Sequence, residues 1–154
     1  NFRSANFILQ STDSLMIEKY ASINELNDDI SAVPYDGGNK EKILKCYNKA
    51  VEINLSDPDA WYIMGIKLVA DDCYNEAYNS FSKALDTAFA IHFASLVWMG
   101  HLNDLKNKRE EAIAMYRKAL DAYPGFPVQH DQWKIVIDRK WIEERMRVPF
   151  RGVK

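Results

Sequence analysis

The sequence is poor in the residues that mark disulfide-stapled, loop-rich or all-β proteins. Its two cysteines, Cys46 and Cys73, are too few and too far apart to form a disulfide framework, and no CxxC motif occurs. The 154 residues include 6 glycines and 5 prolines, fewer than an all-β fold of this size normally uses. Hydrophobic residues make up 47% and charged residues 27%, which suits one globular domain with a core of its own. This composition favours helices.

Motifs of catalysis and cofactor binding are also missing. The sequence has no HExxH, no GxSxG and no glycine-rich phosphate loop. Among the three histidines (His92, His101 and His130), His101 has a candidate partner, because Asp104 lies three residues further along a predicted helix. The sequence does not indicate which residue could supply the third ligand that a metal site would need. We therefore predict that the chain is not an enzyme and that it holds no metal and no cofactor.

The charge is low in total and uneven along the chain. The net charge of −2 gives no domain-wide basic field, so no nucleic-acid partner is expected. Residues 1–38 carry two basic and six acidic side chains, whereas residues 139–154 carry six basic and two acidic ones. The basic end could meet an anionic partner, although a solvated helix face is the commoner explanation of such a run.

Long hydrophobic runs are absent too. The longest apolar stretch, residues 89–99, is interrupted by His92 and Ser95 and is shorter than the roughly 18 residues of a membrane span, so no membrane partner is expected. The chain starts with Asn1 rather than Met, so a targeting segment could already have been removed. The location stays open, with the cytoplasm as the default.

A repeat of 34–35 residues runs through the middle of the chain. The stretches CYNKAVEI, SFSKALDT and MYRKALDA align, and each has an aromatic residue three positions before an alanine. The segments WYIMG and LVWMG, upstream of the second and third stretches, end in glycines that are 35 residues apart. The recurring positions are Tyr47, Phe81 and Tyr116, then Ala50, Ala84 and Ala119, with Gly65 and Gly100, and Ala77 and Ala112. Several independent markers on one period indicate a structural repeat.

Each repeat reads as a pair of helices. Trp61, Gly65 and Leu68 follow the i, i+4, i+7 spacing of one helix face. The dipeptide Asp57-Pro58 is a helix start signal, since the carboxylate can accept from free backbone amides and proline suits the first helical position. A glycine inside a helix costs up to about 1 kcal/mol relative to alanine, so its recurrence indicates that two helices approach closely there.

These residues resemble the tetratricopeptide repeat, a helix–turn–helix unit that stacks into a solenoid. The second unit matches the family pattern at Trp61, Met64, Gly65, Leu68, Ala77, Phe81 and Ala84. The third unit matches it at Leu96, Met99, Gly100, Ala112, Tyr116, Ala119 and Pro124. Phe89 departs from the pattern at the proline of the second unit, and Asn103 at the aromatic position of the third.

The resemblance covers residues 40–125 and implies an all-α fold, an α-solenoid of antiparallel helix pairs in a right-handed superhelix. One domain, residues 1–154, would contain units over 12–55, 57–88 and 90–124 and a capping helix over 128–147. The first helix of unit one would bury the stripe Leu15, Met16, Tyr20, Ile23, Leu26 and Ile30. The capping helix would bury Trp133, Ile137 and Trp141, which recur every four residues.

The resemblance also implies a function. In this family the first helices of successive units line a concave groove that receives a peptide or another protein, so a protein- or peptide-binding scaffold is expected. The groove positions carried over to this sequence are Tyr62, Ile66, Val69, Val97, Trp98, His101 and Asp104. Aromatic residues such as Tyr62 and Trp98 would be the anchors of a partner.

Three alternatives stay open. The N-terminal segment of the chain could fill the groove, the chain could be a regulatory or assembly domain of a larger protein, or it could self-associate into a homo-oligomer. An RNA-binding helical repeat is disfavoured by the acidic balance. The substitution Trp98→Ala separates an open groove from a filled one, because it would weaken partner capture in the first case and unfold the chain in the second.

Overall fold

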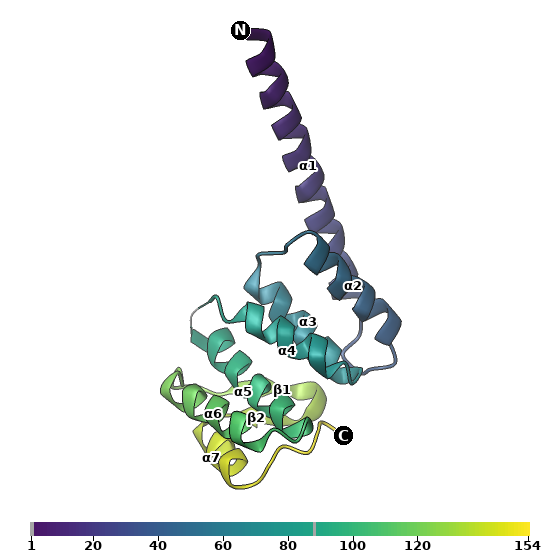
Figure 1. Cartoon of the computed structure of the whole chain (residues 1–154). Coiled ribbons are helices and arrows are strands. Elements are labelled where there is room, and N and C mark those ends of the chain that lie inside the picture. Colours follow the sequence, from purple (N-terminus) through teal and green to yellow (C-terminus); the bar gives the residue numbers. More distant parts are fainter. Residues whose placement is uncertain (1, 88) are drawn as a thin grey trace.

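The computed structural model describes residues 2–87 and 89–154, and in these it has seven α-helices and one two-stranded sheet (Figure 1). The elements are α1 (Phe2–Ala32), α2 (Lys40–Glu52), α3 (Pro58–Ala70), α4 (Tyr74–Ala84), α5 (Phe89–Leu105), α6 (Arg109–Asp121), β1 (Val128–His130), β2 (Ile135–Ile137) and α7 (Arg139–Arg147). Helix α3 packs along α4 and helix α5 along α6, and the two pairs meet through α4 and α5. The predicted all-α helical repeat is confirmed.

The recurring glycines lie where the helices of a pair touch. A Cβ atom added to Gly65 would sit 2.8 Å from Cε1 of Phe81, and one added to Gly100 would sit 2.5 Å from Cε1 of Tyr116. The alanines at the same level, Ala77 and Ala112, are fully buried. The close approach that the spacing predicted is confirmed at both pairs.

We expect Gly100→Ala to lower the free energy of unfolding by about 1–3 kcal/mol, as overpacking of a dense core does. The ring of Tyr116 cannot withdraw from the new methyl group, because its hydroxyl donates to Oδ2 of Asp104 at 2.7 Å. This strain outweighs the gain of about 1 kcal/mol in helix propensity. Urea unfolding followed by circular dichroism measures the difference. Ser82→Ala, at an exposed position of α4, is the control and should be neutral; an unchanged midpoint for Gly100→Ala would contradict the argument.

The predicted start of α3 is also confirmed. The side chain of Asp57 accepts a hydrogen bond from the backbone N–H of Asp59 at 3.0 Å, and Pro58 occupies the first turn. The proline loses nothing there, because the first amides of a helix have no partner within the helix. This cap fixes the direction in which α3 enters the stack.

Among residues 14–32 of helix α1, whose side chains the structure describes, the buried ones lie in the C-terminal part. Leu26 and Ile30 are buried, and the ammonium group of Lys67 on α3 donates to the carbonyl of Ile30, near the negative end of the helix dipole. The predicted stripe continues upstream, but Met16 and Tyr20 are 48% and 62% exposed, so the expectation that its whole length is buried was wrong. The reason is length, since α1 has 31 residues and its neighbour α2 has 13. Figure 1 shows the N-terminal half of α1 projecting from the body.

Residues 128–137 form a β-hairpin where the sequence predicted the first half of a helix. Strand β1 pairs antiparallel with β2 in the register Val128↔Ile137, and Lys134 takes a left-handed conformation with φ 55° in the turn. Burial in β2 alternates from Ile135 to Ile137, as in a strand with one covered face. The capping helix is therefore shorter than predicted: α7 starts after Asp138, whose carboxylate accepts from the backbone N–H of Trp141 at 2.8 Å.

In the described part of the chain, no helix combines the length and the apolar character that crossing a bilayer requires.

Candidate protein-interaction surface

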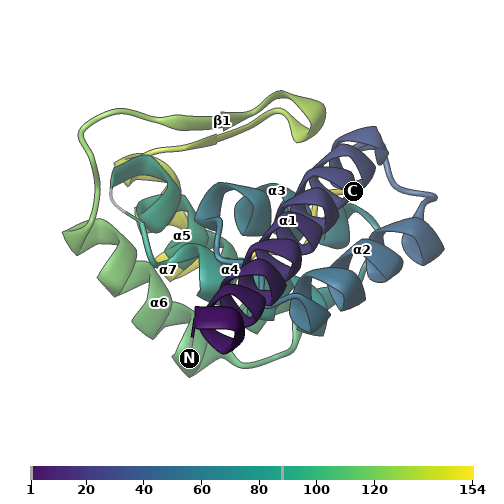
Figure 2. The same cartoon turned by 90° about the horizontal axis from the view of Figure 1, so that it is seen from above.

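The seven predicted groove residues lie on one face of α3 and α5, which we call the first-helix face. Six of them are buried, namely Ile66, Val69, Val97, Trp98, His101 and Asp104, and Tyr62 is partly buried. The face is therefore covered in this structure. The β-hairpin and the C-terminal residues contact this face, and Figure 2 shows the hairpin running along α3 and α5. The C-terminal part of α1 also packs against α3.

The hairpin contacts the face through His130. Trp98 donates its indole N–H to Nε2 of His130 at 3.2 Å, so this nitrogen carries no proton. The hydroxyl of Tyr62 lies 2.9 Å from the same atom and therefore acts as a donor. Burial lowers the pKa of His130 to about 4, although the charge of Asp131 acts in the opposite direction. His130 is thus a neutral acceptor that joins α3 and α5 to the hairpin.

His101 is a second buried neutral imidazole. It accepts from the indole N–H of Trp141 at 3.0 Å, and its ring stacks on the ring of Phe150 with a centroid distance of 3.9 Å and an interplanar angle of 15°. Burial, and then the charge of Arg145, hold the pKa of His101 well below its usual range. The ring serves as an aromatic surface with a fixed orientation.

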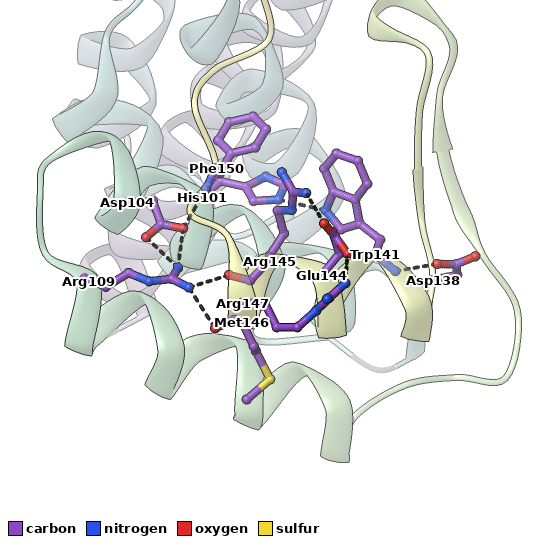
Figure 3. Close-up of polar contacts among 10 residues, drawn as sticks. All are labelled: His101, Asp104, Arg109, Asp138, Trp141, Glu144, Arg145, Met146, Arg147 and Phe150. Carbon is purple, nitrogen blue, oxygen red and sulfur yellow. Dashed lines mark hydrogen bonds and ion pairs between the residues drawn. The ribbon is translucent and has the colours of Figure 1, made fainter.

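The carboxylate of Asp104 is the polar centre of the face (Figure 3). Its two oxygens accept from Nη1 of Arg109 at 3.0 and 3.1 Å, and Oδ2 also accepts from the hydroxyl of Tyr116 and from the backbone N–H of Phe150 at 2.9 Å. The other terminal nitrogen of Arg109 donates to the carbonyls of Arg145 and Met146, both at 2.8 Å. A single carboxylate thus joins α5 to α6 and to the C-terminal residues.

Residues 148–154, which we call the tail, follow α7 without regular secondary structure. Phe150 is 4% exposed, between His101, Trp98 and Trp141. Phe150 and His130 were not among the residues predicted for this surface. Residue type alone could have pointed to them. Neither residue belongs to a periodic pattern, so the sequence could not assign either one to a helix face.

Comparison with known proteins identifies the helix pair α5 and α6, and α5 contributes four of the seven residues of the first-helix face. Residues 93–126, which cover most of α5 and all of α6, match the sequence model of the tetratricopeptide repeat. These residues are therefore a tetratricopeptide repeat. The chain is also 30% identical over 81 residues to the protein called "Protein CTR9 homolog" from Arabidopsis thaliana, a match that covers 53% of this chain and 7% of that protein. No solved structure matches.

The stability of the chain should fall as the pH decreases from 7 to 5. His130 and His101 are neutral when folded and regain a pKa near 6.5 on unfolding. Below pH 6.5 the unfolded chain therefore binds more protons, and the stability present above that pH is lost as the pH falls toward the folded pKa of His130. The loss is about 1.4 kcal/mol per pH unit for each histidine.

Urea unfolding at pH 7, 6 and 5, a range above the ordinary titration of carboxylates, measures this slope. His130→Gln keeps an acceptor oxygen and should remove about half of the pH dependence of stability. His92→Gln is the control, because His92 is only partly buried. A stability that does not change between pH 7 and pH 5 would contradict the neutral, buried state of both rings.

Proposed function

We propose that the chain is a non-catalytic scaffold that binds a protein or peptide partner on the first-helix face, with Tyr62, Ile66, Val69, Val97, Trp98, His101 and Asp104 as its floor. One observation carries the proposal. The tail, which is not helical, lies on this face and is held by a backbone hydrogen bond and a stacked aromatic ring. An extended peptide from another protein would be held by the same kind of contact.

The chemistry of the face supports binding rather than catalysis. The Nε2 atoms of His101 and His130 already accept from indole N–H groups, so neither lone pair is free to abstract a proton from a substrate. Asp104 accepts four hydrogen bonds. Among the described residues, no three His, Cys, Asp or Glu side chains are grouped so that they could hold a metal ion.

Affinity capture with three full-length baits tests the proposal. Phe150→Ala removes the anchor of the tail and should increase capture of the native partner relative to the wild type. Phe89→Ala changes an aromatic side chain that is 78% exposed and that belongs to no contact described for the first-helix face, so its capture should equal that of the wild type. Equal capture by all three baits would place the partner on another surface and overturn the proposal.

A further inference from the structure

The tail is buried most deeply at one residue, although Pro149, Gly152 and Val153 are partly buried and Val153 also packs against the core. Phe150 is 4% exposed, whereas Val148 before it is 43% exposed and Arg151 after it is exposed. At the far end, the ammonium of Lys154 lies 3.3 Å from Oδ2 of Asp72 in an exposed ion pair, which contributes little. A segment that adds a whole layer to a core buries alternate side chains along its length. In this segment Phe150 is the one buried side chain, and the residues on either side of it are partly buried or exposed, as in a short peptide ligand with a single deep anchor.

The residues that form the pocket of Phe150 also make contacts that do not involve the tail. Arg109 and Tyr116 hold the carboxylate of Asp104 from α6, and Trp141 on α7 fixes the ring of His101. Arg109 also donates to the carbonyls of Arg145 and Met146, so α7 is bound to α6 through contacts that do not involve the tail. Without Phe150 the site would offer an oriented carboxylate oxygen and an aromatic surface, which contacts with α6 and α7 hold in place.

The tail can separate from α7 at a defined point. The backbone N–H of Val148 makes the last hydrogen bond of α7, to the carbonyl of Glu144 at 2.8 Å, and Val148 is already extended. Pro149 follows and cannot donate a backbone hydrogen bond. Beyond it, the hydrogen bond from Phe150 to Asp104 and the ion pair of Lys154 are the polar contacts that the structure gives residues 149–154.

We propose that the Phe150 pocket, formed by Trp98, His101, Asp104 and Trp141, is a recognition site for an extended peptide segment of another protein that presents an aromatic residue. The tail occupies the site in cis and competes with that segment. This inference rests on the proposed function and specifies its ligand class. The aromatic ring stacks on His101, and the backbone N–H of the same residue donates to Asp104, so proline is excluded at that position.

The flanking charges define the ligand further. The tail places basic side chains one and four residues after the aromatic residue, at Arg151 and Lys154, and Lys154 reaches the acidic end of α3 at Asp72. A ligand with basic residues after the aromatic one would reproduce this contact. Because a tethered segment acts at an effective concentration of roughly millimolar, the tail competes well even if its own affinity is modest.

Fluorescence anisotropy with labelled peptides tests the proposal on the full chain. The probe is Arg-Val-Pro-Phe-Arg-Gly-Val-Lys, the sequence of residues 147–154. We expect it to bind the Phe150→Ala chain and to bind the wild type at least about tenfold more weakly, because the wild-type tail fills the pocket. Phe126→Ala, which changes an aromatic residue that is 50% exposed and absent from the pocket, should behave as the wild type.

Changes in the probe peptide test the hydrogen bond to Asp104 and the stacking on His101 without altering the fold of the chain. N-methylation at the phenylalanine removes the donor to Asp104 and should weaken binding to the Phe150→Ala chain about tenfold or more, the usual effect of losing a hydrogen bond to a buried charge. Exchange of the phenylalanine for alanine should have at least as large an effect, because it removes the stacked ring. If Phe150→Ala shows reduced helicity, Phe150→Leu, which keeps an apolar side chain, replaces it in the same measurements.

Three outcomes would overturn the inference. The first is a probe that does not bind a folded Phe150→Ala or Phe150→Leu chain, and the second is binding that both peptide changes leave unaltered. The third is a lower molecular mass for Phe150→Ala than for the wild type in light scattering, which would show that the tail comes from a second copy. If the probe fails while the Phe150→Ala bait still captures more partner, the ligand class is wrong and the proposed function stands. If the probe does not bind and the Phe150→Ala bait captures no more partner than the wild type, the ligand class and the proposed function are both wrong.

Discussion

Asp104→Ala is expected to lower the free energy of unfolding by about 3–5 kcal/mol, the usual cost of removing one partner from a buried ion pair. The carboxylate of Asp104 has no exposed surface, and the guanidinium of Arg109 beside it belongs to a side chain that is 30% exposed. Without the carboxylate, Arg109 loses its counter-charge, and the hydroxyl of Tyr116 and the N–H of Phe150 lose their acceptor. One substitution thus weakens α5, α6 and the tail together.

Chemical unfolding of Asp104→Ala beside Asp104→Asn and Asp121→Ala measures this loss. The asparagine keeps the size and one acceptor oxygen but not the charge, so its loss should be smaller than that of the alanine. Asp121 is exposed near the end of α6 and should change stability by no more than about 0.5 kcal/mol. A loss below about 1 kcal/mol for Asp104→Ala would show that the cluster is dispensable.

The helix pairs could be predicted from the sequence because their signals are local. Gly65 and Phe81 are 16 residues apart, within a single unit, and the same pairing recurs at Gly100 and Tyr116. A glycine that packs against an aromatic ring of the next helix occurs at a fixed distance from that aromatic residue in the sequence, so the pair can be recognised. The cap at Asp57 is equally local, since it depends on three consecutive residues.

The cover of the first-helix face could not be predicted, because it depends on contacts between distant residues. Phe150 and Asp104 are separated by 46 residues, and Trp98 and His130 by 32. The family resemblance placed Trp98, His101 and Asp104 on one helix face. It gave no information on what lies opposite that face, since a buried face and an open groove have the same periodicity.

The hairpin was missed for a related reason. Trp133, Ile137 and Trp141 recur every four residues, as on a helix, but they lie in a 3-10 turn, a strand and α7 respectively. Short strands of three residues give too few positions for an alternating pattern to compete with a helical one. The left-handed residue Lys134, which closes the turn, carries no sequence signal of the kind that glycine or asparagine would give.

Trp98→Ala should destabilise the chain by about 3–5 kcal/mol, the usual cost of truncating a large buried aromatic side chain. Trp98 is fully buried, and its ring stacks on Phe81 of the neighbouring pair at 6.0 Å with an interplanar angle of 13°. It also contacts His130, Trp133 and Phe150. The substitution therefore opens a cavity where the two helix pairs, the hairpin and the tail meet, and it removes the indole donor to His130.

Urea unfolding and near-ultraviolet circular dichroism distinguish this position from an open groove. Trp98→Phe keeps most of the apolar volume and loses the N–H, so it should cost less than the alanine; Trp133→Ala, at a partly buried position of the hairpin, should also cost less. A Trp98→Ala chain that kept its stability but lost its partner would mean that the indole faces an open groove. We expect Trp98→Ala to lose both stability and the aromatic circular dichroism signal. This result follows because the chain already covers the first-helix face with its own C-terminal residues.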